Sequence, residues 1–366
     1  MPYSLTVKKT EGKPGQVYYP LQLNTIPLPS PGPGQLLIKL SAAALNHRDL
    51  FIRQHLYPGI SFTAPLLADG YGTVSALGPS CSTFSQSLLN TPVLLLPTRG
   101  WTAAPDGPEN LARDFCIIGA AQGTPVGTAQ EYVVVDEGDV VPAPEHLTPC
   151  EGAALPLVGV TGWRALVTKS GGNAEPGRNL LVTGIGGGVA LQVLLFAVAR
   201  GCNVWVTSGD EGKIERAVGM GARGGVNYKE QGWEKKLAGM LPEERPYLDA
   251  VIDGAGGEVV GKTVRLLKPG GVISCYGMTV GPKMDWVIQA TLKHVELRGT
   301  TMGSKKEFEE MVAFVREHKI RPVVSRVVKG LDNIEGIDSL FEDMKAGRQF
   351  GKLVIQIDGE DSAPKL

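Results

Sequence analysis

A glycine-rich turn in the middle of the chain constrains the fold more than any other feature of the sequence. Residues 182–190 read Val-Thr-Gly-Ile-Gly-Gly-Gly-Val-Ala, directly after an apolar run and before a helical pattern. Glycine lets a backbone turn tightly between a strand and a helix and lets a ligand approach closely. The uncharged stretch 181–199 is long enough to cross a bilayer, but its glycines would break a helix. We therefore predict a buried strand, a turn and a buried helix.

The pattern continues after this turn, with short apolar runs alternating with amphipathic stretches. The expected strands lie at residues 179–184, 203–208, 225–228, 248–254 and 271–277. The expected helices lie at residues 187–200, 211–220, 233–241 and 258–267, and Lys268-Pro-Gly-Gly is expected to be the stop after the last of them. Apolar strands separated by helices indicate a parallel sheet covered on both faces. We predict a doubly wound α/β domain.

The first 150 residues have a different pattern. Short strand candidates at residues 35–42, 72–77, 91–96 and 128–135 stand between turns rich in proline and glycine. This pattern is typical of a compact, mainly antiparallel β domain. Thr148-Pro-Cys-Glu predicts a capped helix start leading toward the second domain. A helix is expected at residues 305–318, and a late strand at residues 350–357 is expected to return to the first domain.

Charge and cysteine content exclude several classes of protein. The chain has 36 Lys and Arg against 37 Asp and Glu, whereas proteins that coat nucleic acid or anionic membranes need a basic excess. We expect a small-molecule substrate and no nucleic-acid or membrane partner. The five cysteines are an odd number without Cys-x-x-Cys spacing, and the start lacks a signal-peptide pattern. A cytoplasmic protein is expected, although the terminal Pro364-Lys365-Leu366 weakly resembles a peroxisomal signal.

The glycine turn and the strand that follows it predict a nucleotide cofactor. Free N–H groups at such a turn bind a pyrophosphate, and the expected contacts are Gly184, Gly186, Gly187, Gly188 and Val189. An NAD site usually has an acidic residue at the end of the second strand. Here that strand ends in Ser208, Lys213 follows in the next helix, and Tyr228 closes the third strand. Hydroxyls and a cation favour a 2′-phosphate, so we predict NADPH.

Three other interpretations are compatible with these residues. Asp210 or Glu211 could turn toward the ribose and favour NADH, although acids also suit the first turn of a helix. The glycines could serve only close packing of strand and helix. A methyltransferase that binds S-adenosylmethionine also has a glycine-rich turn, but it normally has an acid where Thr207-Ser208 stands.

Several stretches together resemble the medium-chain dehydrogenase/reductase superfamily over nearly the whole chain. They are Ala44-Leu-Asn-His-Arg-Asp-Leu-Phe-Ile-Arg, Gly72-Thr-Val, Gly127-Thr-Ala-Gln-Glu-Tyr, Ala153-Ala-Leu-Pro, Thr161-Gly-Trp-Arg-Ala, the glycine turn and Arg348-Gln-Phe-Gly-Lys-Leu-Val. The resemblance implies a GroES-like β-rich catalytic domain, residues 1–158 and 303–366, and a Rossmann NADPH-binding domain, residues 159–302. It also implies a homodimer joined through the edges of the Rossmann sheets.

The resemblance also indicates which branch of the superfamily is the best match. Alcohol dehydrogenases of this family hold a catalytic zinc ion between a Cys, a His and a second Cys. The matching positions here are Asn46, Ala68 and Leu157, and the stretch that matches the four-cysteine structural zinc lobe contains only Cys116. Alcohol oxidation assisted by zinc is therefore not expected. The sequence resembles the zinc-independent quinone oxidoreductases and enoyl reductases, and we expect no metal.

That branch implies hydride transfer from NADPH to an activated C=C bond or a quinone. Tyr57 matches a tyrosine near the substrate carbonyl in related enoyl reductases, and Asn46 could orient the nicotinamide or the substrate oxygen. The further cofactor contacts that the resemblance implies are His47, Thr161, Gly277, Thr301 and Lys352. Plainer explanations such as packing, capping or contact with solvent also exist for Tyr57, Asn46, Thr161 and Lys352. The alternative function is a non-catalytic NADPH-binding redox sensor or crystallin-like protein.

Overall fold

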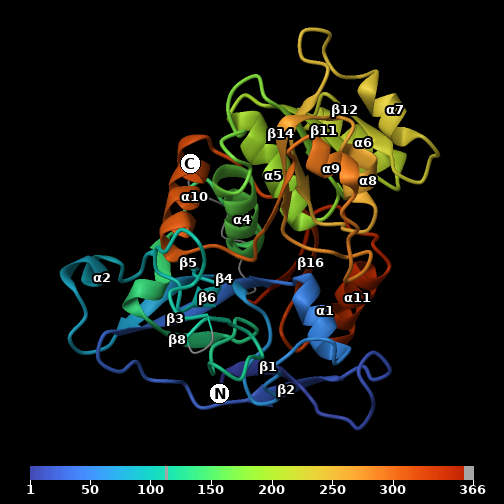
Figure 1. Cartoon of the computed structure of the whole chain (residues 1–366). Coiled ribbons are helices and arrows are strands. Elements are labelled where there is room, and N and C mark those ends of the chain that lie inside the picture. Colours follow the sequence, from blue (N-terminus) through green and yellow to red (C-terminus); the bar gives the residue numbers. More distant parts are fainter. Residues whose placement is uncertain (112–113, 358–366) are drawn as a thin grey trace. The chain divides into compact units, whose positions relative to one another are not determined.

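The computed structural model describes residues 1–111 and 114–357 (Figure 1). The peroxisome-like ending at residues 364–366 lies outside this range. The chain folds into two compact units, within which most residue contacts lie, and each unit is described by itself. Unit 1 comprises Met1–Leu157 and Ser304–Leu366, and unit 2 comprises Val158–Gly303. These divisions lie one residue from the predicted boundaries.

Unit 1 is built on a mostly antiparallel sheet around the long strand β3. Its strands are β3 (Gln35–Ala44), β4 (Asp69–Leu77), β5 (Pro92–Leu95), β8 (Tyr132–Asp136), β9 (Val140–Pro142), β16 (Val324–Lys329) and β17 (Lys352–Gln356). β3 pairs with β4, β8 and β17, and its apolar side chains Leu36, Ile38 and Leu40 lie in the core of the unit. The predicted β domain is confirmed.

The end of the chain completes this sheet. β17 pairs antiparallel with β3, so that Val354 lies opposite Ala44. The predicted return of the late strand to the first domain is therefore confirmed. This pairing brings Lys352, at the start of β17, to the same end of the sheet as Ala44 and the residues that follow it.

Helices and small sheets surround the main sheet of unit 1. The helices are α1 (His47–Arg53), α2 (Thr83–Ser87), α3 (Pro149–Ala153), α10 (Lys305–Glu317) and α11 (Ile334–Lys345), with the 3₁₀ turn η1 (Glu137–Asp139). Two further pairs of strands are β1 (Tyr3–Val7) with β2 (Leu21–Thr25) and β6 (Thr98–Arg99) with β7 (Cys116–Ile117). The capping box predicted at Thr148 is present: its Oγ1 accepts from the Glu151 N–H, and Glu151 Oε2 accepts from the Thr148 N–H.

Unit 2 is a doubly wound parallel sheet, as predicted. Its strands are β10 (Asn179–Val182), β11 (Asn203–Ser208), β12 (Gly224–Asn227), β13 (Leu248–Asp253), β14 (Leu267–Cys275) and β15 (Glu296–Gly299). They pair in the order β12-β11-β10-β13-β14-β15, all parallel. The order reverses beside β10, which is the place where such sheets bind ligands at the carboxyl ends of their strands. This is the predicted Rossmann arrangement.

Connecting helices link these strands. They are α4 (Pro156–Trp163), which begins in unit 1 and continues as the π-helical turn η2 (Arg164–Thr168), α5 (Gly188–Ala199), α6 (Glu211–Gly219), α7 (Trp233–Ala238), α8 (Val259–Thr263) and α9 (Ile288–Leu292). The predicted strand, turn and helix at the glycine turn are confirmed by β10 and α5. No helix in residues 1–111 and 114–357 has the length and apolar character needed to span a membrane.

The predicted boundaries around β14 are wrong. The helix expected at residues 258–267 is shorter, because α8 ends at Thr263. The expected stop Lys268-Pro-Gly-Gly instead lies inside β14, where Gly270 has a φ of +69° and the pairing with β13 shifts register. The glycine accommodates an irregularity within a strand that begins at Leu267, rather than a turn before a strand.

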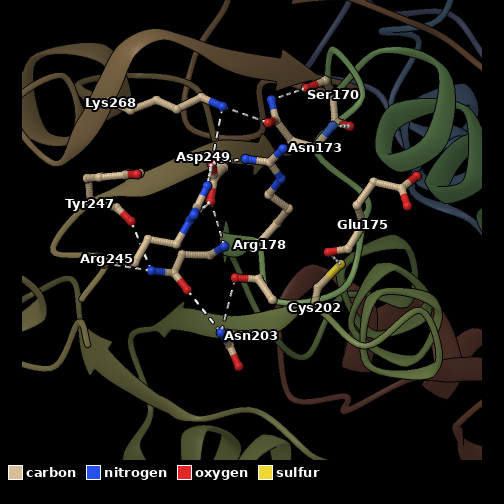
Figure 2. Close-up of polar contacts among 12 residues, drawn as sticks. Ser170, Asn173, Glu175, Arg178, Cys202, Asn203, Arg245, Tyr247, Asp249 and Lys268 are labelled. Atoms are coloured by element: carbon tan, nitrogen blue, oxygen red, sulfur yellow. Dashed lines mark hydrogen bonds and ion pairs between the residues drawn. The ribbon is translucent and has the colours of Figure 1, made fainter. Parts of the chain in front are cut away.

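A polar cluster around Asp249 holds the amino end of the sheet (Figure 2). Asp249 is fully buried in β13 and accepts a hydrogen bond from the Asn179 N–H at the start of β10. Arg178, Arg245 and Lys268 surround its carboxylate. Burial raises the pKa of Asp249, but hydrogen bonds from Arg245, the Asn179 N–H and Lys268 outweigh it and lower the pKa to about 2. The cluster ties β10, β13 and β14 together.

Candidate functional site

The carboxyl edge of the unit 2 sheet gathers most of the predicted cofactor residues. The strand register places Val182 beside Val206, Ser208 beside Asn227, and Asp253 beside Cys275. The loops that leave these strands therefore begin at a common edge. The predicted residues on this edge are Gly184, Gly186, Gly187, Gly188, Val189, Ser208, Tyr228, Gly277 and Thr301.

Backbone hydrogen bonds fix the glycine turn. The Gly184 N–H donates to Thr207 Oγ1 (3.2 Å), and the Ile185 N–H donates to the Thr207 carbonyl (2.8 Å). Gly184 and Gly186 have φ values of +65° and +113°, which disfavour any residue with a side chain. Gly187 is the N-cap of α5, and Gly188 and Val189 form its first turn. The first N–H groups of α5 are thus available to an anion.

Hydroxyl groups lie at the end of β11, and cations lie near it on α6 and after β12. A Cβ atom placed on Gly186 would lie 2.8 Å from Lys213 Cδ, so the Lys213 side chain lies against the turn. Burial lowers the pKa of Lys213. Ser208 is buried, and the Tyr228 N–H donates to its carbonyl. A Cβ atom placed on Gly209 would lie 2.9 Å from the Tyr228 hydroxyl oxygen and 3.0 Å from Lys229 Nζ, so both groups lie beside Gly209.

Lys229 was not among the predicted contacts. It follows Tyr228 directly in the sequence, so the missed signal was a second cation next to a predicted hydroxyl. One of the two acids that could have favoured NADH, Asp210, has a different role in the structure. Asp210 is the N-cap of α6, and its Oδ1 accepts from the Lys213 N–H at 3.3 Å. This agrees with the interpretation that the acid suits the start of a helix.

A second residue that the sequence interpretation missed is Asp253 at the end of β13. Its buried carboxylate accepts from Thr183 Oγ1 at 2.6 Å and from the N–H groups of Ala255 and Gly256. These hydrogen bonds lower the pKa of Asp253, but burial outweighs them and raises it. Asp253 therefore orders the loop after β13 next to the glycine turn. An acid directly after the apolar run Ala-Val-Ile was the available signal.

The remaining predicted residues of unit 2 lie on three different segments. Thr161 is buried in α4, and its Oγ1 lies 3.6 Å from Met302 Sδ. Gly277 follows β14, and its carbonyl oxygen lies 3.2 Å from Cys275 Sγ. Thr301 is exposed after β15. Their contacts with a cofactor remain predictions.

Unit 1 brings three buried polar side chains into direct contact. Asn46 is the N-cap of α1, Asp69 begins β4 and Lys352 begins β17, and they are 6%, 0% and 4% exposed. Asn46 Nδ2 donates to Asp69 Oδ2 at 2.8 Å, and Lys352 Nζ donates to Asn46 Oδ1 at 2.6 Å. Lys352 Nζ also donates to Asp69 Oδ2 (2.8 Å) and to the Leu45 carbonyl (2.6 Å).

These contacts give Lys352 a role that the sequence did not indicate. An ammonium group has three N–H donors, and three oxygen atoms of unit 1 lie within hydrogen-bond distance of Lys352 Nζ. The prediction that Lys352 contacts a cofactor phosphate gains no support from this geometry. His47, by contrast, is exposed at the first position of α1 and is accessible to a ligand.

Tyr57 lies beside a small cavity in unit 1. Its ring packs against Arg48, whose Cζ lies 4.9 Å from the ring centroid. Arg48 is itself paired with Asp49 at 3.3 Å, and burial raises the pKa of Asp49 to about 6. The cavity has a volume of about 290 Å³, and its lining is mainly aromatic and apolar: Lys9, Tyr19, His55, Tyr57, Pro58, Gly59, Ile60, Phe62 and Gln122.

The residues present do not fit a catalytic zinc ion. Ala68 and Leu157 have no ligand atom in their side chains, and the Asn46 side chain is bonded to Asp69 and Lys352. The Lys352 ammonium, 2.6 Å from Asn46 Oδ1, would repel a divalent cation bound there. Across residues 1–111 and 114–357, no group of three or more His, Cys, Asp or Glu side chains could hold a metal ion.

Known proteins similar to this chain cover almost its full length. A "Zinc-type alcohol dehydrogenase-like protein YogA" from Leptosphaeria maculans is 59% identical over 98% of this chain and 100% of its own. An acryloyl-coenzyme A reductase from Sulfurisphaera tokodaii is 27% identical (92% and 96% covered). A mouse quinone oxidoreductase is 25% identical (90% and 91% covered). The crystal structure of an NAD-dependent alcohol dehydrogenase superposes with a TM-score of 0.82 at 29% identity, covering 98% and 100%.

Family comparisons agree with the two units. Residues 32–145 match the alcohol dehydrogenase GroES-like domain, and residues 188–317 match the zinc-binding dehydrogenase domain. The first match lies in the β-rich unit, and the second begins at the start of α5 and includes strands β11 to β15 of the parallel sheet. Together with the identity to full-length relatives, these matches show that the chain belongs to the medium-chain dehydrogenase/reductase superfamily of oxidoreductases.

Proposed function

We propose that this protein is a zinc-independent, NADPH-dependent reductase of activated C=C bonds or quinones. The observation that carries the proposal is the buried contact of Asn46 with Lys352 and Asp69, at the position where zinc-dependent relatives would have a metal ligand. The names of the acryloyl-coenzyme A reductase and the quinone oxidoreductase support this reaction class. The name of the YogA relative favours a zinc-type enzyme, so metal content is a direct test.

Unit 2 supports NADPH as the cofactor. The glycine turn, fixed by Thr207, leaves the first N–H groups of α5 for a pyrophosphate. Ser208, Lys213, Tyr228 and Lys229 supply hydroxyl and ammonium groups for a 2′-phosphate. Asp210 caps α6 and Glu211 lies in its first turn, so we propose that neither acid binds the ribose. The remaining predicted contacts, His47, Thr161, Gly277 and Thr301, belong to the same proposal.

The proposed chemistry needs hydrogen-bond donors from unit 1. Reduced nicotinamide, when bound, supplies a hydride to the β-carbon of an enone, and the π electrons move to the carbonyl oxygen. That oxygen gains negative charge, which a nearby donor must stabilise. Asn46 Nδ2 carries two N–H groups. One donates to Asp69, and the other is proposed to donate to the substrate oxygen. The Tyr57 hydroxyl is the proposed source of a hydrogen bond or of the proton that completes the reaction.

The cavity beside Tyr57 favours an apolar substrate. Tyr19, Tyr57 and Phe62 contribute aromatic rings to its lining. Aromatic rings stack on flat apolar groups and exclude water from them. A quinone ring or the apolar part of an enone suits this lining better than a small polar alcohol.

Coenzyme oxidation distinguishes the proposal from its alternatives. Purified protein is mixed with NADPH or NADH and with a panel of enones, enoyl thioesters, quinones and primary alcohols, and the absorbance of the reduced coenzyme is followed. We expect NADPH oxidation with an enone or a quinone and no zinc by elemental analysis. Stoichiometric zinc with alcohol oxidation would contradict the proposal. Tight NADPH binding without turnover would favour the redox-sensor function.

We also propose that the protein is a cytoplasmic homodimer joined through unit 2. Among residues 1–111 and 114–357, β15 is an edge strand of its sheet, with an unpaired side that another strand can extend. Large apolar side chains on β15 and in the segment that precedes it in the chain are exposed: Trp286, Ile288, Leu292 and Leu297. Light scattering after size-exclusion chromatography should give the mass of a dimer. Leu292→Lys, with Lys235→Ala as a control, should shift that mass toward a monomer.

A further inference from the structure

We propose that Lys352 is a positioning residue that orients and polarises the Asn46 amide, so that this amide takes the place of a metal ion at the substrate's carbonyl oxygen. The inference deepens the proposed function and rests on it. It assigns a role to a lysine that is buried, bonded to three oxygens and separated from Asn46 by 306 positions in the sequence.

The two charged neighbours of Asn46 determine its orientation. An ammonium group can only donate hydrogen bonds, and a carboxylate can only accept them. The Asn46 Oδ1 atom must therefore face Lys352, and its Nδ2 atom must face Asp69, as the distances of 2.6 and 2.8 Å show. A flipped amide would oppose donor to donor and acceptor to acceptor. The pair thus selects a single orientation of the amide.

The Lys352 charge also changes the amide chemically. A cation bound at the amide oxygen draws electron density from the nitrogen, which makes the remaining N–H a stronger donor. Within the described residues, the second N–H of Asn46 has no acceptor, because the structure pairs Nδ2 with Asp69 alone. This N–H is the one available to an oxygen that gains negative charge. Burial of Asn46, Asp69 and Lys352 keeps the effect strong, since little water screens it.

Asp69 connects all three positions that match metal ligands in the zinc-dependent relatives. Its Oδ2 accepts from Asn46 and Lys352, and its Oδ1 accepts from the Leu157 N–H at 2.7 Å. Ala68 precedes it in the chain. The buried Asp69 carboxylate and the buried Lys352 ammonium therefore fix the segments that carry the three matching positions. Together the two groups carry no net charge.

A pair of variants separates polarisation from simple stability. Lys352→Met removes the ammonium but leaves Asp69 as an unpaired buried charge, which destabilises the fold. Lys352→Met with Asp69→Asn removes both charges and keeps an amide oxygen that can accept from Asn46 Nδ2. We expect kcat of both variants to fall about 10- to 100-fold, as for supporting contacts of metal ligands. KM for NADPH should change less than about twofold, because only transition-state binding is lost. Lys306→Met, an exposed residue of α10, is the control.

A second readout does not depend on activity. In a ¹H–¹⁵N spectrum the Asn46 side-chain amide is identified by its loss in Asn46→Asp. Its protons should move upfield in both Lys352 variants and stay in place in Lys306→Met. An unmoved resonance, or wild-type kcat in the double variant, would overturn the inference. If the wild-type protein reduces no substrate, the proposed function fails, and the resonance still tests whether Lys352 polarises Asn46.

Discussion

Arg245 donates two hydrogen bonds to Asp249, from Nε to Oδ2 and from Nη2 to Oδ1, each 2.7 Å long. Such a two-point contact is stronger and more directional than a single ion pair. It lies at the amino end of the parallel sheet, where Lys268 also bonds to Asp249 (Figure 2). The Asn179 N–H donates to the same carboxylate. The carboxyl edge of the same sheet carries the candidate cofactor residues. We infer that the Asp249 cluster stabilises unit 2 and takes no part in the reaction.

Asp249→Asn should therefore lower stability without changing chemistry. Three partly buried cations lose their counter-charge, and we expect a loss of about 2–3 kcal/mol in the free energy of unfolding at neutral pH. The folded-state pKa of about 2 lies below the ordinary value of 3.8, so the ionised carboxylate stabilises the fold above about pH 4. This contribution is lost as the pH falls from 4 toward 2. Urea unfolding at several pH values should show the two proteins converging over that range.

The exposed Asp285 provides the control for this experiment. Asp285→Asn also removes one acid from unit 2, so it matches the change in net charge. We expect its unfolding midpoint to equal that of the wild type at every pH. Equal stability of Asp249→Asn and the wild type at pH 7 would show that the cluster contributes nothing.

Gly186→Ala should disturb the glycine turn. At a φ of +113° a side chain is strained, and the new Cβ would lie 2.8 Å from Lys213 Cδ. We expect a cost of about 1–3 kcal/mol in stability, and weaker NADPH binding because Lys213 must move. Gly187→Ala is the matched comparison, since Gly187 has a φ of −72° and its nearest atom would be 3.6 Å away. Equal urea midpoints for the two variants would contradict the strain argument.

Lys213→Ala should weaken NADPH binding much more than NADH binding. A charge-assisted hydrogen bond contributes about 1.5–3 kcal/mol, so the Kd for NADPH should rise about 10- to 100-fold. NADH has no 2′-phosphate, and its Kd should barely change. Fluorescence titration with both coenzymes provides the measurement, and Lys235→Ala on the exposed face of α7 is the control. Parallel losses for both coenzymes would show that Lys213 does not recognise the 2′-phosphate.

The sequence predicted those parts of the fold that local pattern determines. The strand before Gly184 and the helix after Gly187 were predicted because apolar periodicity and glycines act over a few residues. The start of β14 was predicted wrongly because that prediction also relied on a local pattern. Lys268-Pro-Gly-Gly resembles a turn locally, but pairing of Leu267 with Leu248 on the neighbouring strand extends β14 through it. Tertiary pairing overrode the local signal.

The contacts of Lys352 could not be predicted in this way. Sequence resemblance suggested Asn46 and Lys352 separately, one near the substrate and the other near a phosphate. Their contact depends on the antiparallel pairing of β17 with β3, which joins segments about 300 residues apart. Asp69 was missed because its partners Asn46 and Lys352 lie far from it in the sequence. Buried polar networks of this kind are determined by tertiary structure.

Tyr57→Phe tests the second proposed donor. The change removes only the hydroxyl and keeps the ring that packs on Arg48 and lines the cavity, so the fold should be unaffected. If the hydroxyl stabilises the developing negative charge or supplies the proton, kcat with an enone should fall about 100-fold. Tyr3→Phe, at the exposed first residue of β1, should leave kcat unchanged. A Tyr57→Phe variant with wild-type kcat and an unchanged solvent isotope effect would assign the proton to water and leave Asn46 as the remaining donor proposed from unit 1.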